Sequence, residues 1–245
     1  MRWTHEESYK GPGLVSLLHR RRLSKLLSIF EKIEIEKNGV LADFGCSDGY
    51  LLSVLQENFF QNSTYNFCGF DHSNELLELA KEKNLPNTIY HYINLNNVDD
   101  RWNNSFNIVL CLETLEHTGN YENALDTLYS SCKNGGTIII SVPNEKGIPG
   151  IFKYFGRKII RKNAYGNFFE NRSEISYLIH LIFNKQIDQF RESDTDGWGP
   201  HLGFDWKVFK NTIEEKYLKT NKLELIFTDD HKLKFGYFYV LKKIE

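Results

Sequence analysis

The sequence predicts an α/β fold, a doubly wound Rossmann-like sheet of seven mostly parallel strands with helices on both faces and an inserted cap. Between Val40 and Val142, short apolar runs alternate with amphipathic segments, which is the pattern of right-handed βαβ units. The run Phe106–Leu112 is almost entirely apolar, as expected of a strand buried on both faces. A turn with two glycines follows the first strand, at the carboxyl edge of the predicted sheet.

The individual elements follow from periodicity and turn residues. We expect parallel strands at 40–44, 65–70, 88–93, 106–112 and 137–142, and a closing antiparallel pair at 223–228 and 235–241. Apolar residues recur at helical spacing in 19–33, 50–60, 74–83 and 120–132. Ser73 is suited to cap the third of these helices, and Pro86 separates it from the next strand.

Composition excludes several classes of protein. The 245 residues carry a formal net charge of -2, so no global basic field indicates nucleic acid. No apolar stretch of about 18 residues is present, so no membrane span is expected. The four cysteines lack Cys-x-x-Cys spacing, which favours reduced thiols in a cytoplasmic protein. Abundant Asn, Lys, Ile and Phe are typical of a bacterial, AT-rich genome.

The segment Val40–Leu52 carries the strongest functional signal. Gly45 and Gly49 let the backbone turn tightly and approach a ligand, and Asp43 supplies a carboxylate for a cationic ligand group. No Lys-Ser or Lys-Thr pair follows the second glycine, so the loop is not a P-loop. The pattern predicts a nucleotide-handling loop.

Three further landmarks follow this loop in order: Gly69-Phe70-Asp71, Phe106 to Glu113, and Gly135 to Asn144. With them, residues 38–145 resemble the class I S-adenosylmethionine-dependent methyltransferases. The resemblance implies a bound S-adenosylmethionine, with Asp43 supporting the ammonium of its amino-acid tail. It implies these cofactor-binding residues: Asp43, Gly45, Cys46, Gly49, Asp71, His72, Asn94 and Leu112.

Three of these positions leave alternatives. Asp71 has two acceptor oxygens for the ribose hydroxyls, but Asp also favours helix N-caps. His72 could flank the adenine or be an exposed turn histidine. Asn94 stands where the family often has Asp, and its side-chain oxygen can still accept from the adenine amine.

Glu113-Thr114-Leu115-Glu116-His117 is the sharpest local signal for the acceptor side. On a helical turn, Glu113, Glu116 and His117 would share one face. The string resembles the ubiquinone-biosynthesis O-methyltransferases, and also the terminal 2′-O-methyltransferases of small RNAs, in which such residues bind a divalent cation. It therefore predicts either a metal site for an ion such as Mg²⁺ or a metal-free turn that orients substrate.

We expect a single domain of four segments: an N-terminal helical segment at 1–37, the cofactor-binding core at 38–144, the inserted cap at 145–205, and a C-terminal helix and strands at 206–245. His201, where the cap rejoins the core, is a candidate general base or a packed corner residue. Ile151–Lys162 has no acidic residue, so it is either a solvated basic helix face or a contact for a membrane surface or an anionic substrate.

The expected activity is O-methylation of a small-molecule, lipid-linked or sugar hydroxyl. His117 or His201 is the predicted base, assisted by Glu116, with a divalent cation as the alternative. A cytoplasmic protein is expected, with possible peripheral contact to the inner face of the membrane through 151–162 and no nucleic-acid partner. The rival hypotheses are an RNA 2′-O-methyltransferase with a divalent metal and a non-catalytic cofactor-binding partner subunit.

Overall fold

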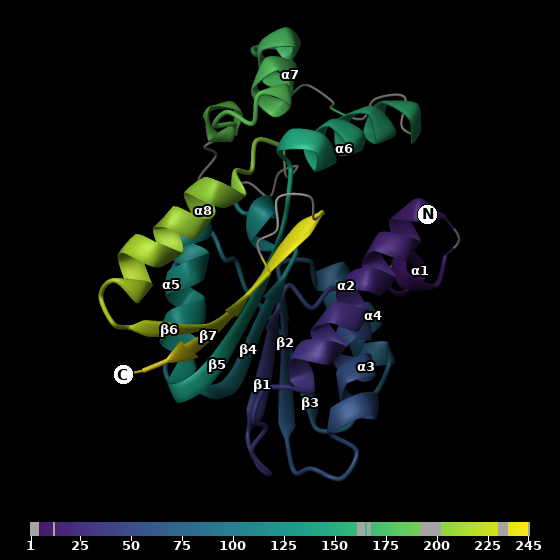
Figure 1. Ribbon diagram of the computed structural model, residues 1–245. Helices are drawn as coiled ribbons and strands as arrows, with labels where there is room; N and C mark the ends of the chain where they lie inside the picture. Colours follow the sequence, from purple (N-terminus) through teal and green to yellow (C-terminus); the bar gives the residue numbers. More distant parts are fainter. Residues whose placement is uncertain are drawn as a thin grey trace.

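The computed structural model describes residues 5–11, 13–160, 165, 168–191, 202–229 and 235–244. Seven strands form one sheet in the order β3-β2-β1-β4-β5-β7-β6 (Figure 1). β7 is antiparallel to both of its neighbours, and the other paired strands run parallel. The mostly parallel seven-stranded sheet is thus confirmed. Its strands are β1 (Val40–Phe44), β2 (Asn66–Asp71), β3 (Thr88–Tyr92), β4 (Phe106–Leu112), β5 (Cys132–Pro143), β6 (Leu223–Thr228) and β7 (Gly236–Lys243).

Helices cover both faces of this sheet. Leu41 of β1 packs with α2 (Leu14–Phe30), α3 (Tyr50–Phe59) and α4 (Asn74–Glu82) on one face. The next residue, Ala42, packs on the other face with α5 (Tyr121–Ser131), α8 (Trp206–Ile213) and the π-helix Glu214–Leu218. Because strand side chains alternate between the faces, each buried strand contributes to both apolar cores.

The order of the strands fixes where a ligand can bind. β1 pairs with β2 on one side and with β4 on the other, so the connections diverge at the carboxyl end of β1. In open parallel sheets this divergence leaves a crevice beyond the strand ends. The glycine turn after Phe44 lies in that crevice.

Two boundaries differ from the sequence prediction. β5 begins at Cys132, whereas Thr137 was predicted, because a register shift against Phe106 and Ile108 admits Gly135 into the strand at a φ of 74°. The first long helix runs from Leu14 to Phe30, and a short helix that was not predicted, α1 (His5–Lys10), precedes it.

The cap contributes α6 (Gly147–Ile160), α7 (Glu174–Ile182) and a 3-10 turn, Asp188–Phe190. Figure 1 shows α6 and α7 beyond the carboxyl ends of the parallel strands. They share a separate apolar cluster that includes Tyr154 and Tyr177. No helix in the described ranges is long and apolar enough to cross a membrane.

Buried ion pairs lie where the cap begins and ends. Lys146 Nζ lies 2.5 Å from Asp205 Oδ2, and both side chains are almost fully buried. Glu145 is also buried and receives Lys153 Nζ at 2.9 Å and the Arg157 guanidinium at 2.9 Å and 3.0 Å. Lys153 and Arg157 therefore face inward, which neither sequence alternative for 151–162, a solvated basic face or a contact for a membrane surface or anionic substrate, anticipated.

Candidate functional site

The glycine loop is held rigidly against the neighbouring strand. The amides of Gly45 and Cys46 both donate to Phe70 O, at 2.7 Å and 3.0 Å, and the Gly49 amide donates to Cys46 O at 2.9 Å. Gly45 has a φ of 91°, and a Cβ there would lie 2.1 Å from Thr114 Oγ1. Glycine is therefore required at this position by both backbone conformation and close packing.

Asp43, the next-to-last residue of β1, is a buried acid with one oxygen that lacks a hydrogen-bond partner among the described residues. Its side chain is 2% exposed, and its Oδ2 has no hydrogen-bond partner among the described residues. Burial, followed by the negative charge of Asp71, raises the pKa of Asp43 to about 7. An unsatisfied buried carboxyl group is costly, so the site fits a ligand that brings a cation.

Asp71 ends β2 in a different environment. Its Oδ2 accepts from the Ser47 amide and its Oδ1 from the Ser73 amide, both at 2.9 Å. Burial by itself would raise the pKa of Asp71, but hydrogen bonds from His72, Ser73 and Ser47 leave it lowered. Ser73, as predicted, is the cap of α4. Asp71 is therefore an ionised carboxylate that orders the loop.

The two remaining candidates for the adenosine end lie beside Asp71 and β3. His72 Nδ1 is 3.3 Å from Asp71 Oδ1, and its side chain is 37% exposed. Asn94 follows β3, and its Oδ1 accepts from the Asn96 amide at 3.1 Å, so the amide side chain is turned toward its own backbone. Their predicted roles at the adenine stay predictions.

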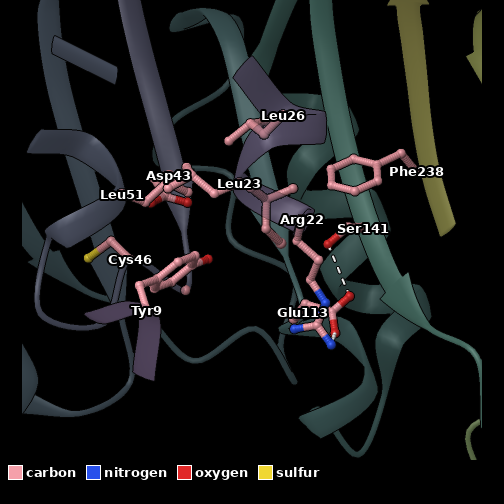
Figure 2. Close-up of a pocket in the computed structure, with 12 residues that line it drawn as sticks. Tyr9, Arg22, Leu23, Leu26, Asp43, Cys46, Leu51, Glu113, Ser141 and Phe238 are labelled. Atoms are coloured by element: carbon pink, nitrogen blue, oxygen red, sulfur yellow. Dashed lines mark hydrogen bonds and ion pairs between the residues drawn. The ribbon is translucent and has the colours of Figure 1, made fainter. Parts of the chain in front are cut away.

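A small pocket, partly open to solvent, lies at the carboxyl ends of β1 and β4. Figure 2 shows that it brings together the loop and the N-terminal helices. Four predicted cofactor-binding residues line it, namely Asp43, Gly45, Cys46 and Leu112, whereas Gly49, Asp71, His72 and Asn94 do not. The other lining residues are Tyr9, Arg22, Leu23, Leu26, Leu51, Glu113, Ser141 and Phe238.

Sequence reasoning missed Tyr9 and Arg22. α1 lies over the loop because the Glu6 amide donates to Asp48 Oδ2 at 3.0 Å, and this contact brings Tyr9 to the pocket. Arg22 lies one helical turn before the buried Leu26. A cation on the apolar face of a helix was the available signal for Arg22.

The Glu113–His117 string does not form the helical turn that was expected. Only Leu115–His117 adopts a 3-10 turn, and Glu113 precedes it with a φ of 52°. Glu113 Oε2 pairs with Arg22 Nη2 at 2.9 Å, and its Oε1 accepts from Ser141 Oγ at 3.2 Å. The prediction of three residues on one helix face is therefore wrong, because the left-handed residue turns Glu113 toward α2.

Glu116 and His117 lie next to each other in the 3-10 turn. The Glu116 side chain is 3% exposed, its Oε2 has no hydrogen-bond partner among the described residues, and Oε1 is 3.9 Å from His117 Nε2. Burial, and then the charge of Glu113, raises the pKa of Glu116 well above its usual range. Burial thus favours the protonated form of Glu116, and the predicted catalytic roles of Glu116 and His117 stay predictions.

The predicted metal site and the predicted second base have different outcomes. The described part of the chain contains no group of three His, Cys, Asp or Glu residues arranged to hold a metal ion. The predicted ligand Glu113 is instead paired with the guanidinium of Arg22. His201 lies outside the described residues.

Known proteins resemble this chain in sequence and in fold. A family model described as a methyltransferase domain matches residues 17–181. The tRNA U34 carboxymethyltransferases of Helicobacter acinonychis (strain Sheeba) and Helicobacter pylori (strain Shi470) are 28% and 29% identical to this chain over 112 residues. The match covers 42% of this chain and 40% of each relative, so less than half the length of these relatives is represented.

Two solved structures have a similar fold. A putative S-adenosylmethionine-dependent methyltransferase from Listeria monocytogenes gives a TM-score of 0.58 at 16% identity, covering 94% of this chain and all of that one. The CurJ carbon methyltransferase gives a TM-score of 0.58 at 12% identity, covering 98% of this chain and 57% of that one. At such identities the likeness concerns the fold alone.

Proposed function

Since the chain belongs to the methyltransferase-domain family and is an S-adenosylmethionine-dependent methyltransferase, we propose that it methylates a hydroxyl oxygen of a small, sugar or lipid-linked acceptor. The observation that carries the choice of site is the buried Asp43 Oδ2, which has no hydrogen-bond partner among the described residues and faces the pocket beside the glycine loop. The tail ammonium of the cofactor would supply the missing partner.

The residues present fit this cofactor. Asp43 would hold the ammonium of the tail, and Asp71 would accept the ribose hydroxyls with its ionised carboxylate. The predicted places of His72 and Asn94 are beside the adenine. When bound, S-adenosylmethionine supplies a methyl group on a positively charged sulfur, so the chain's own residues need only position and deprotonate the acceptor.

We assign the proton transfer to His117. Its neutral imidazole takes the hydroxyl proton while the acceptor oxygen bonds to the methyl carbon. The transfer would give a methyl ether, S-adenosylhomocysteine and a protonated His117. Glu116, kept neutral by burial, would donate a hydrogen bond that orients the acceptor or the imidazole.

His117→Ala should lower the rate of methyl transfer by about 10²–10⁴-fold with little change in cofactor affinity. His180→Ala is the matched control, because its Nδ1 bonds Ser176 O within its own helix. If a cation held by Glu113, Glu116 and His117 acts instead, EDTA should stop turnover and Mg²⁺ should restore it. Full activity of His117→Ala, with no effect of EDTA, would contradict both versions.

The surface of the cap supports an apolar acceptor. The buried faces of α6 and α7 include Tyr154 and Tyr177. On the outer faces, Phe152 is 67% exposed and Ile159 is 84% exposed. Together the two helices and the residue after α7 expose these large apolar side chains: Ile148, Phe152, Phe155, Ile159, Ile175, Ile179, Ile182 and Phe183. Such a concentration is typical of a surface that meets lipid or another apolar partner.

An RNA acceptor is the second candidate, favoured by the similarity to the tRNA U34 carboxymethyltransferases. The net charge of -2 and the apolar exposed surface of the cap argue against it, because RNA binding relies on clustered cations.

One labelling experiment separates these acceptors. The protein and S-adenosylmethionine with a tritiated methyl group are incubated with a lipid extract, a polar metabolite extract or total RNA. We expect label in the lipid or polar fraction, released only by reagents that cleave ethers. Label found only in RNA would replace this proposal with the RNA candidate.

A further inference from the structure

Arg22 is the one cation among the residues that line the described pocket, and the known role of the loop does not account for it. It projects from α2 toward the carboxyl ends of β1 and β4, with a side chain 22% exposed (Figure 2). Its neighbours Arg20 and Arg21 do not line the pocket. A charge held on the sheet-facing side of this helix, one turn before the buried Leu26, needs a reason.

Most backbone donors of the glycine loop already have acceptors within the protein, which explains why a side-chain cation is needed in the pocket. The amides of Gly45, Cys46 and Gly49 donate to backbone carbonyls, and the Ser47 amide donates to Asp71. Four of the five loop amides are thus committed inside the protein. The Glu113 amide, at the end of β4, is committed to Ser141 O. An anionic ligand group in this pocket therefore needs side-chain donors.

The charges of the pocket match a zwitterionic tail on a cationic sulfur. Among the described lining residues, Arg22 is the base and Asp43 and Glu113 are the acids, with Asp43 ionised when a ligand cation lies beside it. The bound cofactor would carry an ammonium, a sulfonium and a carboxylate, so its net charge would be +1. The net charge of the residues that line the pocket would then be -1. Asp43 suits the ammonium, which leaves the carboxylate for Arg22.

We propose that Arg22 binds the α-carboxylate of the cofactor's amino-acid tail and that Glu113 positions it. The inference rests on the proposed cofactor site. A guanidinium has five N–H donors, and the ion pair with Glu113 engages one terminal nitrogen, so the same group can bind a second carboxylate. Asp43 would then bind the ammonium of the amino-acid tail, and Arg22 would bind its carboxylate.

The backbone at Glu113 supports the positioning role. A φ of 52° is uncommon for a residue other than glycine and costs free energy. It directs the carboxylate toward both Arg22 and Ser141, which hold it at 2.9 Å and 3.2 Å. The strained residue therefore fixes the direction of the guanidinium before the cofactor arrives.

The test measures binding and does not depend on turnover. Isothermal titration calorimetry compares S-adenosylhomocysteine with its decarboxylated analogue, in which the tail ends in the amine alone. The wild-type protein should bind the complete ligand about 10–100-fold more tightly, the range of a charge-assisted hydrogen bond. Arg22→Gln should reduce this ratio to about 1–3, mainly by weakening the complete ligand.

Matched variants keep the outcome specific. Arg21→Gln, on the exposed side of the same helix, should retain the wild-type ratio, and so should Asp43→Asn, which removes the partner of the amine. If Arg22→Gln does not fold, Arg22→Lys should still lower the ratio at least threefold, because lysine lacks the planar fork.

The outcomes separate this inference from the proposed function. If the wild-type protein binds neither ligand, the cofactor site itself is misassigned. If it binds both equally, or if the Arg22 variants keep the wild-type ratio, the assignment of the carboxylate to Arg22 is overturned while the cofactor site stands.

Discussion

The pocket and the cap differ in whether their buried acids have partners within the protein. In the pocket, Asp43 is buried with an oxygen that no described residue satisfies. In the cap, Glu145 is equally buried but receives both Lys153 and Arg157, and Lys146 pairs directly with Asp205. What the cap exposes is a set of large apolar side chains, such as Phe152 and Ile159.

This difference distinguishes ligand-binding charge from structural charge. A buried charge with its partners present holds elements together, and removing one partner leaves the other uncompensated. A buried charge lacking a partner weakens the folded state and is retained where a ligand completes it. Three predictions test this distinction between ligand-binding and structural charge, from the largest expected change in the free energy of unfolding to the smallest.

The largest effect is expected at the pair that joins the cap to α8. Lys146→Met leaves Asp205 buried without its cation and should lower the free energy of unfolding by about 3–5 kcal/mol. Lys158→Met is the matched control. Its ion pair with Glu174 lies at the surface and should contribute less than about 1 kcal/mol. Urea unfolding at pH 7 measures both; equal losses would show that burial does not separate the two pairs.

A second prediction concerns the two acids at the strand ends. The pKa of Asp43 is raised to about 7 in the folded protein, against about 3.9 for an ordinary Asp. The unfolded chain therefore loses this proton first, so Asp43 costs stability progressively as the pH rises from about 4 to 7. Asp43→Asn should remove this cost and gain about 4 kcal/mol at pH 8 relative to pH 4.

Asp71 provides the opposite sign as a control. Its pKa is lowered in the folded protein, so its contribution is present above the ordinary Asp pKa and is lost as the pH falls. Asp71→Asn should therefore be destabilising at pH 7, with a deficit that shrinks below about pH 4. Unfolding curves between pH 2 and 8 measure both variants, and parallel pH profiles would contradict the assigned environments.

The pocket's core could be predicted from sequence because its elements are local. A strand, a glycine turn and an acid are contiguous from Val40 to Gly49, and an apolar run such as Phe106–Leu112 has few alternatives to a buried strand. The seven-stranded sheet and its antiparallel strand were confirmed for this reason.

The parts that were missed depend on contacts between distant segments. Arg22 reaches Glu113 across 91 positions of sequence, and periodicity gives no information on that distance. The turn at Glu113 was predicted as helical because spacing alone cannot reveal a positive φ. The inward pairing of Lys153 and Arg157 was missed because it depends on Glu145 being buried where the cap begins.

The smallest effect on stability, and the sharpest test of the cap, is expected on its outer face. Phe152 and Ile159 are mostly exposed, so the double variant Phe152→Ser, Ile159→Ser should change the free energy of unfolding by less than about 0.5 kcal/mol. Affinity for S-adenosylhomocysteine should stay the same, because neither residue lines the pocket.

If the face meets a lipid surface, co-sedimentation with phosphatidylglycerol vesicles should be strong for the wild-type protein and lost in the double variant. If vesicle binding persists at high salt, it depends on burial of apolar side chains and not on charge, because salt screens charge interactions. This is expected because Lys153, Arg157 and Lys158 of α6 are already paired with acids of the protein. A large loss of stability in the double variant would instead show that this face is covered within the protein, and absence of vesicle binding by the wild-type protein would rule out the membrane contact.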